Sequence, residues 1–188
     1  PNKTRGCEMI GKDIPICETC IQAKATTKVS RQPGQRATKY LETIHSDIWG
    51  PIKPLTWSKG RYFISFIDDY TRWAEVAILP SKEGAYNEFI RWLTQEENQT
   101  ERKLKRYHSD NAKEFSSQQF KNTLQQKGIL NTYSAPYTHE QNGIAETFNR
   151  TILNKVRAML IQSQISHRYW GEALLSAVYI YNRTPHSS

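Results

Sequence analysis

The tripeptide His-Ser-Asp occurs twice in this chain, at residues 45–47 and 108–110, and each copy ends in a carboxylate. A third carboxylate, Glu146, follows Asp110 after 35 intervening residues. Carboxylates are strong ligands for Mg²⁺, which usually takes one or two of them beside water and phosphate oxygens. Two such ions about 3.5–4 Å apart can activate an attacking oxygen and stabilise a leaving one in phosphoryl transfer. The spacing therefore predicts a metal site if the fold brings Asp47, Asp110 and Glu146 together.

A hydrolytic Ser-His-Asp triad is the other chemistry that these residue types suggest. Such triads are assembled from separate elements, whereas here the three residues are neighbours in the chain. If each tripeptide lies on a strand, side chains alternate, so His45 and Asp47 share one face while Ser46 points away. The acid is therefore the functional residue of the tripeptide. For His45 and His108 we expect packing beside the site, or a bond to a backbone group, rather than metal ligation.

The composition favours a polyanionic partner. The chain of 188 residues carries 26 Lys and Arg against 18 Asp and Glu, a net charge of +8, and nucleic acid is the commonest polyanion that such a balance attracts. Three Cys, an odd number, argue against a disulfide framework and fit a reducing compartment. No apolar run reaches the length of a membrane span. We expect a soluble intracellular protein.

The apolar patterns predict a mixed α/β body that positions the three acids. A strand within 40–51 is expected to end near Asp47, and a hairpin over 61–79 surrounds a turn at 68–71. Asp68 and Asp69 lie in that turn, where Asp is expected to make local hydrogen bonds, so they are poor catalytic candidates. The remaining segments are strands within 104–110 and 129–135 and helices over 82–98, 116–127, 144–162 and 167–181.

The N-terminal part of the chain differs from this body. Cys17 and Cys20 form a C-x2-C knuckle of the zinc-ligand type, which supplies half of a four-ligand site. A basic stretch poor in apolar residues follows and contains Pro33-Gly34, which is typical of a linker. The sequence therefore predicts a partial zinc-knuckle segment over 1–22, a basic linker over 23–40 and a globular body over 41–188.

Several short motifs carry a family resemblance. The contexts of the three acids, "HSDIWGP", "SDNAKEF" and "HEQNGIAETFNRT", resemble those of integrases from copia-type long-terminal-repeat retrotransposons, as do "FIDDYTRW" and "WGEALLSAVYIYNRTP". The match spans nearly the whole chain. It implies an α/β RNase H-like fold, with a mixed central sheet flanked by helices. It also implies that Asp47, Asp110 and Glu146 are catalytic and hold two Mg²⁺ (or Mn²⁺) ions.

The resemblance further implies a retrotransposon integrase, part of a polyprotein, that processes the 3′ ends of element cDNA and transfers them into host DNA. Its partners would be double-stranded DNA and further copies of itself, and it would act in the nucleus after a cytoplasmic stage in a virus-like particle. Arg150 and Arg157 follow Glu146 by four and eleven positions on the predicted helix, on the face opposite its apolar stripe. With Asn149, which can also hydrogen-bond within the site, they are the predicted DNA-binding residues; a merely solvated helix face is the alternative.

Two positions depart from the family pattern. The family places a His pair before the knuckle, but no His precedes His45, so Cys17 and Cys20 form an incomplete site for Zn²⁺. Ala112 stands where the family usually has Gly. These departures leave two alternatives open: a catalytically inactive DNA-binding remnant of a transposon polyprotein, and a related transposase or RNase H of the same fold. The intact acidic triad and the copia-like motifs favour the integrase.

Overall fold

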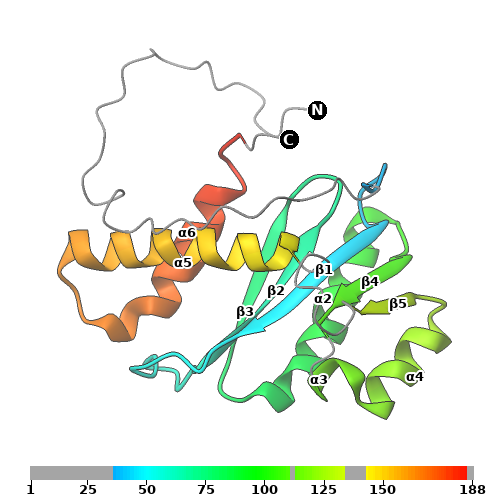
Figure 1. Ribbon diagram of the computed structural model, residues 1–188, viewed down its shortest axis with the longest axis horizontal. Helices are drawn as coiled ribbons and strands as arrows, with labels where there is room; N and C mark the ends of the chain where they lie inside the picture. The colour runs from blue at the N-terminus through cyan, green and yellow to red at the C-terminus, as the bar shows by residue number, and fades with distance from the viewer. Residues whose placement is uncertain (1–35, 111–112, 134–142, 186–188) are drawn as a thin grey trace.

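A five-stranded mixed sheet forms the centre of the computed structural model, which describes residues 36–110, 113–133 and 143–185. The strands stand in the order β3-β2-β1-β4-β5. β1 pairs antiparallel with β2 and parallel with β4, so the sheet combines a hairpin arm with a crossover arm (Figure 1). The strand bounds are β1 Thr43–Trp49, β2 Tyr62–Asp68, β3 Ala74–Leu79, β4 Arg106–Ser109 and β5 Leu130–Tyr133.

Helices cover both faces of this sheet. α5 and α6 pack on one face, while α2, α3 and α4 lie on the other (Figure 1). Their bounds, with two short 3₁₀ turns, are η1 Lys82–Gly84, α2 Ala85–Thr100, α3 Lys113–Ser116, α4 Gln118–Gln126, α5 Gly143–Ser163, η2 His167–Tyr169 and α6 Trp170–Tyr181. The predicted mixed α/β architecture is confirmed. No helix in the described part of the chain is both long and apolar enough to span a membrane.

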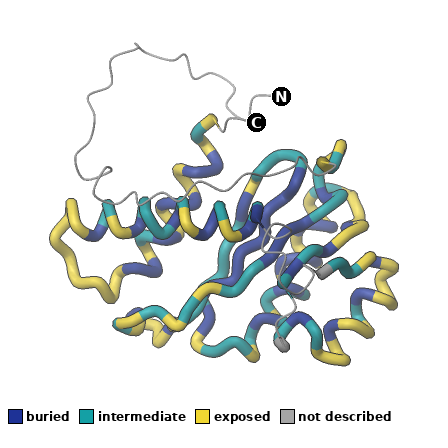
Figure 2. The backbone as a smooth tube through the Cα atoms, in the orientation of Figure 1, coloured by how far each residue is buried: buried dark blue, intermediate teal, exposed yellow. Residues whose placement is uncertain are grey.

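The two-sided sheet has two hydrophobic cores because successive strand residues point to opposite faces. Ile44 and Ile64 pack toward α2 around Phe89, whereas Phe63 and Ile67 pack toward α5 and α6. Figure 2 shows the resulting buried band along the central strands. The same alternation decides which face of the sheet each side chain of β1 points toward.

The element boundaries differ from the expected ones where local geometry decides. β1 continues past Asp47 to Trp49, which pairs with Phe63. The strand stops at Gly50, whose φ of +138° is adopted readily by glycine but not by residues with a Cβ. A Cβ at this position would also lie 2.6 Å from the Tyr62 ring. The helix expected over 116–127 is α4, which begins at Gln118 because Ser117 caps it by accepting a hydrogen bond from the Phe120 N–H, and the short helix α3 before it was not predicted.

The turn between β2 and β3 makes hydrogen bonds to the segment that precedes β1. Asp68 is 1% exposed and accepts hydrogen bonds from the Leu41 N–H at 2.9 Å and from the N–H and hydroxyl of Thr71 at 2.6 Å. Asp69 accepts a hydrogen bond from the Ala37 N–H, and Arg36 donates to the Asp69 carbonyl. The structural role predicted for the two turn acids is confirmed, and the described part of the expected linker is bonded to the turn.

Candidate active site

The repeated tripeptides lie side by side on neighbouring parallel strands. His45 is paired with His108, and Ser46 with Ser109, in the register of β1 and β4. Asp47, within β1, and Asp110, directly after β4, therefore lie at the same level, toward one end of the sheet. Ser46 is fully buried, whereas Asp47 contacts α5 on the other face, so the predicted alternation within the tripeptide is confirmed.

Two directed hydrogen bonds hold the Asp47 carboxylate. The Asn149 side-chain amide of α5 donates to one oxygen at 2.8 Å, and the Ile48 N–H donates to the other at 2.8 Å. Asn149 is 0% exposed, so its amide fixes the carboxylate from within the interface between α5 and the sheet. The hydrogen bond expected of Asn149 within the site is present, while its contact with DNA stays a prediction.

The carboxylates influence one another electrostatically. Burial, with the negative charges of Asp110 and Glu146, raises the pKa of Asp47 to about 6 against the lowering effect of its two hydrogen bonds. Like charges that share a small region disfavour simultaneous ionisation. The site therefore brings together negative charge that a bound cation would neutralise.

Glu146 lies in the first turn of α5 and is exposed. In residues 36–110, 113–133 and 143–185, no three His, Cys, Asp or Glu side chains are grouped closely enough to hold a metal ion together. Asp47 and Asp110 nevertheless fit a hard divalent cation, because Mg²⁺ commonly uses only one or two protein carboxylates. Glu146 would have to approach them to complete the predicted triad. The catalytic and metal-binding roles of the three acids stay predictions.

The two histidines lie beside this site. Their rings meet edge to face with centroids 5.2 Å apart. His45 Nε2 is 3.4 Å from Asp69 Oδ1, and His108 Nδ1 is 2.9 Å from the Thr132 hydroxyl. These contacts agree with the packing role expected for both histidines.

The remaining predicted site residues fall into two groups. Arg150 and Arg157 are exposed on α5, as Glu146 is, and Arg157 donates to Asn154 at 3.0 Å. The helix therefore presents both cations on its exposed side, while their binding to DNA stays a prediction. Cys17, Cys20 and Ala112 lie outside the described residues.

Trp49 is not among the site residues predicted from the sequence. Its position two residues after Asp47 on a strand was the available signal, because that spacing places both side chains on one face of β1. Trp49 is 45% exposed and lines a cavity beside α5. The cavity itself had no sequence signal, since residues from separate segments form it.

Comparison with protein families assigns the chain. The model of the integrase core domain matches residues 37–139, more than half of the sequence. The chain belongs to the integrase core family. This integrase core resembles retrovirus-related Pol polyproteins from plant transposons: it is 35% identical over 175 residues to that of transposon TNT 1-94 of Nicotiana tabacum and 32% identical over 170 residues to that of transposon RE1 of Arabidopsis thaliana.

The alignments cover 93% and 90% of the chain but only 13% and 11% of those relatives. The chain thus corresponds to about an eighth of a Pol polyprotein, and the predicted resemblance to a long-terminal-repeat retrotransposon integrase is confirmed. A solved structure of a simian T-cell lymphotropic virus intasome, in complex with the PP2A regulatory subunit B56 gamma, superposes with a TM-score of 0.67 at 14% identity. It covers 92% of this chain and 59% of its own. This likeness supports the RNase H-like fold that the sequence predicted.

Replacing Asp47 by Asn will stabilise the metal-free protein at neutral pH. Because the folded pKa lies above the ordinary value, the wild type loses stability as pH rises from about 4 to about 6, whereas the neutral amide does not. The gain is roughly 1–2 kcal/mol at pH 8, less than the roughly 3 kcal/mol of the full shift, because Asp47 is only partly buried. Asn149 can rotate its amide and accept from the new side chain, since its own oxygen has no hydrogen-bond partner among the described residues.

Chemical unfolding in EDTA at pH 4, 6 and 8 measures this difference, with Glu172→Gln as the exposed control. The expected difference between variant and wild type is small at pH 4 and grows toward pH 8. A difference that stays constant over this range would show that the pKa of Asp47 is the same in the folded and unfolded protein.

Proposed function

We propose that this integrase core carries out divalent-metal-dependent DNA strand transfer, after hydrolysis that exposes a 3′-hydroxyl at the end of the element. The observation that carries the proposal is the parallel register that aligns the two His-Ser-Asp tripeptides, so that Asp47 of β1 and Asp110, directly after β4, lie at the same level on adjacent strands. The electrostatic effect of both Asp110 and Glu146 on Asp47 supports a common site. Three carboxylates that influence one another in this way are what a metal-binding site requires.

Asp47 and Asp110 would hold Mg²⁺ or Mn²⁺, and Glu146 would complete the site for a second ion. When bound, the two ions supply charge stabilisation for the attacking and leaving oxygens of an in-line displacement. Asn149 orients Asp47 by donating to one carboxylate oxygen, which leaves the second oxygen to the Ile48 N–H and to a further ligand. Because Asn149 is buried and bonded to Asp47, it also ties the helix that carries Glu146 to β1.

The partner that this site fits is double-stranded DNA, both as element ends and as host target. The net charge of +8 and the exposed Arg150 and Arg157 on the Glu146 helix support it. Joining two DNA ends to one target needs more than one active site, so the functional unit is a homo-oligomer. Insertion into host DNA requires action in the nucleus, following a cytoplasmic stage in a virus-like particle.

The test is a strand-transfer and disintegration assay with the purified chain and duplex oligonucleotides, in Mg²⁺, in Mn²⁺ and in EDTA. We expect joined DNA products with either metal and none in EDTA. DNA binding without products under every metal condition would instead support an inactive DNA-binding remnant. Joined products formed equally well in EDTA would show that the reaction does not depend on a metal ion held by the carboxylates.

Arg150→Ala will weaken binding to every duplex alike, because an arginine on this face contacts phosphates rather than bases. Each lost phosphate contact lowers the slope of log affinity against log salt by about one unit. Arg157→Ala is expected to behave in the same way, and Arg91→Ala is the matched control, since Arg91 is exposed on α2 across the sheet. Binding isotherms over a salt series in EDTA measure the slopes. An unchanged slope for Arg150→Ala would mean that the exposed side of α5 is merely solvated.

A further inference from the structure

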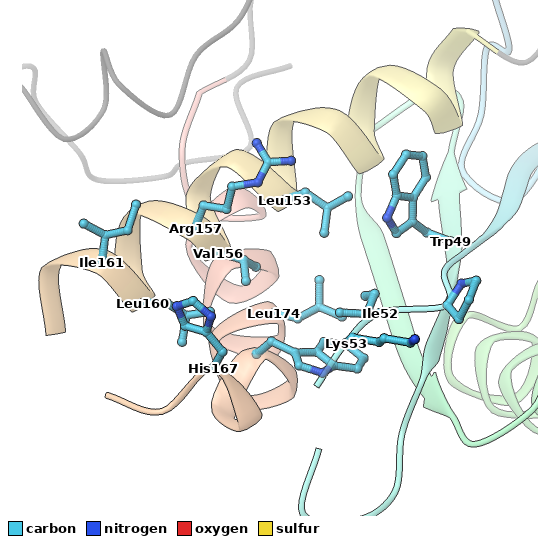
Figure 3. A pocket seen from close by; sticks show the side chains of 12 residues that line it. Trp49, Ile52, Lys53, Leu153, Val156, Arg157, Leu160, Ile161, His167 and Leu174 are labelled. Carbon is cyan, nitrogen blue, oxygen red and sulfur yellow. The ribbon is translucent and has the colours of Figure 1, made fainter. Parts of the chain in front are cut away.

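A cavity of about 440 Å³ lies between α5, α6 and the loop after β1. Figure 3 shows Trp49 at one end of it beside Leu153, and His167 at the other end near Leu160. Its volume falls in the range of about 300–1,000 Å³ that holds small ligands. The cavity is not part of the carboxylate site, but Trp49 connects the two.

The connection runs along β1. Asp47 and Trp49 are two residues apart on the same strand and therefore share its α5-facing side. Two strand residues span roughly 7 Å, which is about two base steps measured along the axis of B-DNA. A DNA strand with a phosphate at Asp47 would thus carry a nucleotide one or two positions away to the mouth of the cavity.

The lining has the chemistry of a nucleotide site. Its floor is apolar, with Ile52, Leu153 and Val156, and the charged residues in the lining are the cationic Lys53 and Arg157. His167 also contributes to the lining, and none of its 12 residues is acidic. An apolar slot with an exposed tryptophan offers stacking to any base, while cations attract the attached phosphate.

The loop that forms one wall is fixed in place. Trp170 of α6 donates its indole N–H to the Pro54 carbonyl at 2.9 Å. Beyond it, the Arg168 guanidinium of η2 lies 4.9 Å from the centre of the ring of Trp57 on the same loop. These contacts fix the loop against η2 and α6, and they place a cation and an aromatic ring beside the cavity, a combination that favours nucleic acid.

We propose that this cavity binds one unpaired nucleotide of the DNA strand held at Asp47, with its base stacked on Trp49. The inference rests on the proposed function, because it takes DNA as the substrate. A paired base lies inside the duplex stack and cannot enter such a slot, so the base has to come from an overhang or be extruded. The integrase core would then distinguish a frayed or overhanging DNA end from a continuous duplex.

The test compares two fluorescent duplexes that differ only in a three-nucleotide overhang, by anisotropy in EDTA with the whole chain. We expect Trp49→Ala to weaken binding of the overhanging duplex by about tenfold or more and that of the blunt duplex by less than about twofold. Trp49→Phe, which keeps an aromatic ring, will retain most of the affinity. Trp73→Ala is the matched control, because Trp73 is also exposed but does not line the cavity.

Equal losses on the two duplexes, or no loss on either, would overturn the inference while leaving the proposed function intact. A wild-type chain that binds neither duplex at low salt would overturn both. If Trp49→Ala instead disrupts self-association and leaves DNA binding unchanged, the cavity is a protein contact and the inference is wrong.

A second measurement uses the unaltered protein and does not depend on how the variants fold. A 5-iodouracil placed in the overhang is irradiated in the complex, and the crosslinked peptide is identified by mass spectrometry. We expect the adduct at Trp49. Adducts found only at residues outside the cavity lining would contradict the inference.

Discussion

Asp110→Asn will lower the rate of strand transfer by at least about a hundredfold, since the loss of a metal-binding carboxylate removes several kcal/mol of charge stabilisation. DNA affinity in EDTA will stay equal or rise, because the substitution removes negative charge next to the phosphates. The assay measures initial rates of joining in Mg²⁺ beside binding isotherms in EDTA. Glu114→Gln is the matched control, because Glu114 belongs to α3, just beyond Asp110, and pairs with Lys82 at 3.4 Å.

An Asp110→Asn variant that joins DNA at the wild-type rate would exclude this carboxylate from the site. A variant that loses joining and DNA binding together would point to a folding defect, and thermal unfolding of the same preparation separates that case. The Glu114→Gln control is expected to keep both activities.

Asp68→Ala will destabilise the fold by about 3 kcal/mol or more. The buried carboxylate accepts three hydrogen bonds from Leu41 and Thr71, and bonds to a charged group contribute about 1.5–3 kcal/mol each without being additive. A loss of this size is a large fraction of the roughly 5–15 kcal/mol that stabilises a typical domain. Urea unfolding followed by circular dichroism measures it.

Glu172→Ala provides the exposed control and is expected to change the unfolding free energy by less than about 0.5 kcal/mol. A loss below about 1 kcal/mol for Asp68→Ala would show that the turn is held mainly by its other contacts, among them those of Asp69 with Ala37 and Arg36.

All five strands and the longer helices could be predicted from the sequence because they have local signatures, whereas the short α3 was not predicted. The hairpin around Asp68 follows from its turn residues, and the long helix of Glu146 follows from its apolar stripe. The repeated tripeptide predicted two equivalent acids, although strand pairing between β1 and β4 is a property of the whole topology and has no local signal. Only the structure shows that the two copies are in register.

Contacts between distant segments were beyond sequence reasoning. The cavity beside Trp49 is formed where the loop after β1 packs against α5 and α6. The sequence of any one of these segments does not predict that packing. The contacts of Arg36 and Ala37 with the β2–β3 turn likewise join a polar stretch, which composition alone marks as a linker, to buried acids. Such long-range polar contacts leave no periodic pattern in the sequence.

The central claim is that Asp47, Asp110 and Glu146 jointly hold two divalent ions. The most direct measurement is anomalous diffraction from crystals of the chain with a DNA-end duplex, soaked in Mn²⁺. We predict two peaks about 3.5–4 Å apart, with Asp47 and Asp110 ligating the ions and Glu146 drawn in to ligate one of them. Mn²⁺ peaks at other residues, with the Asp47 and Asp110 carboxylates free of metal beside the bound DNA, would contradict the account.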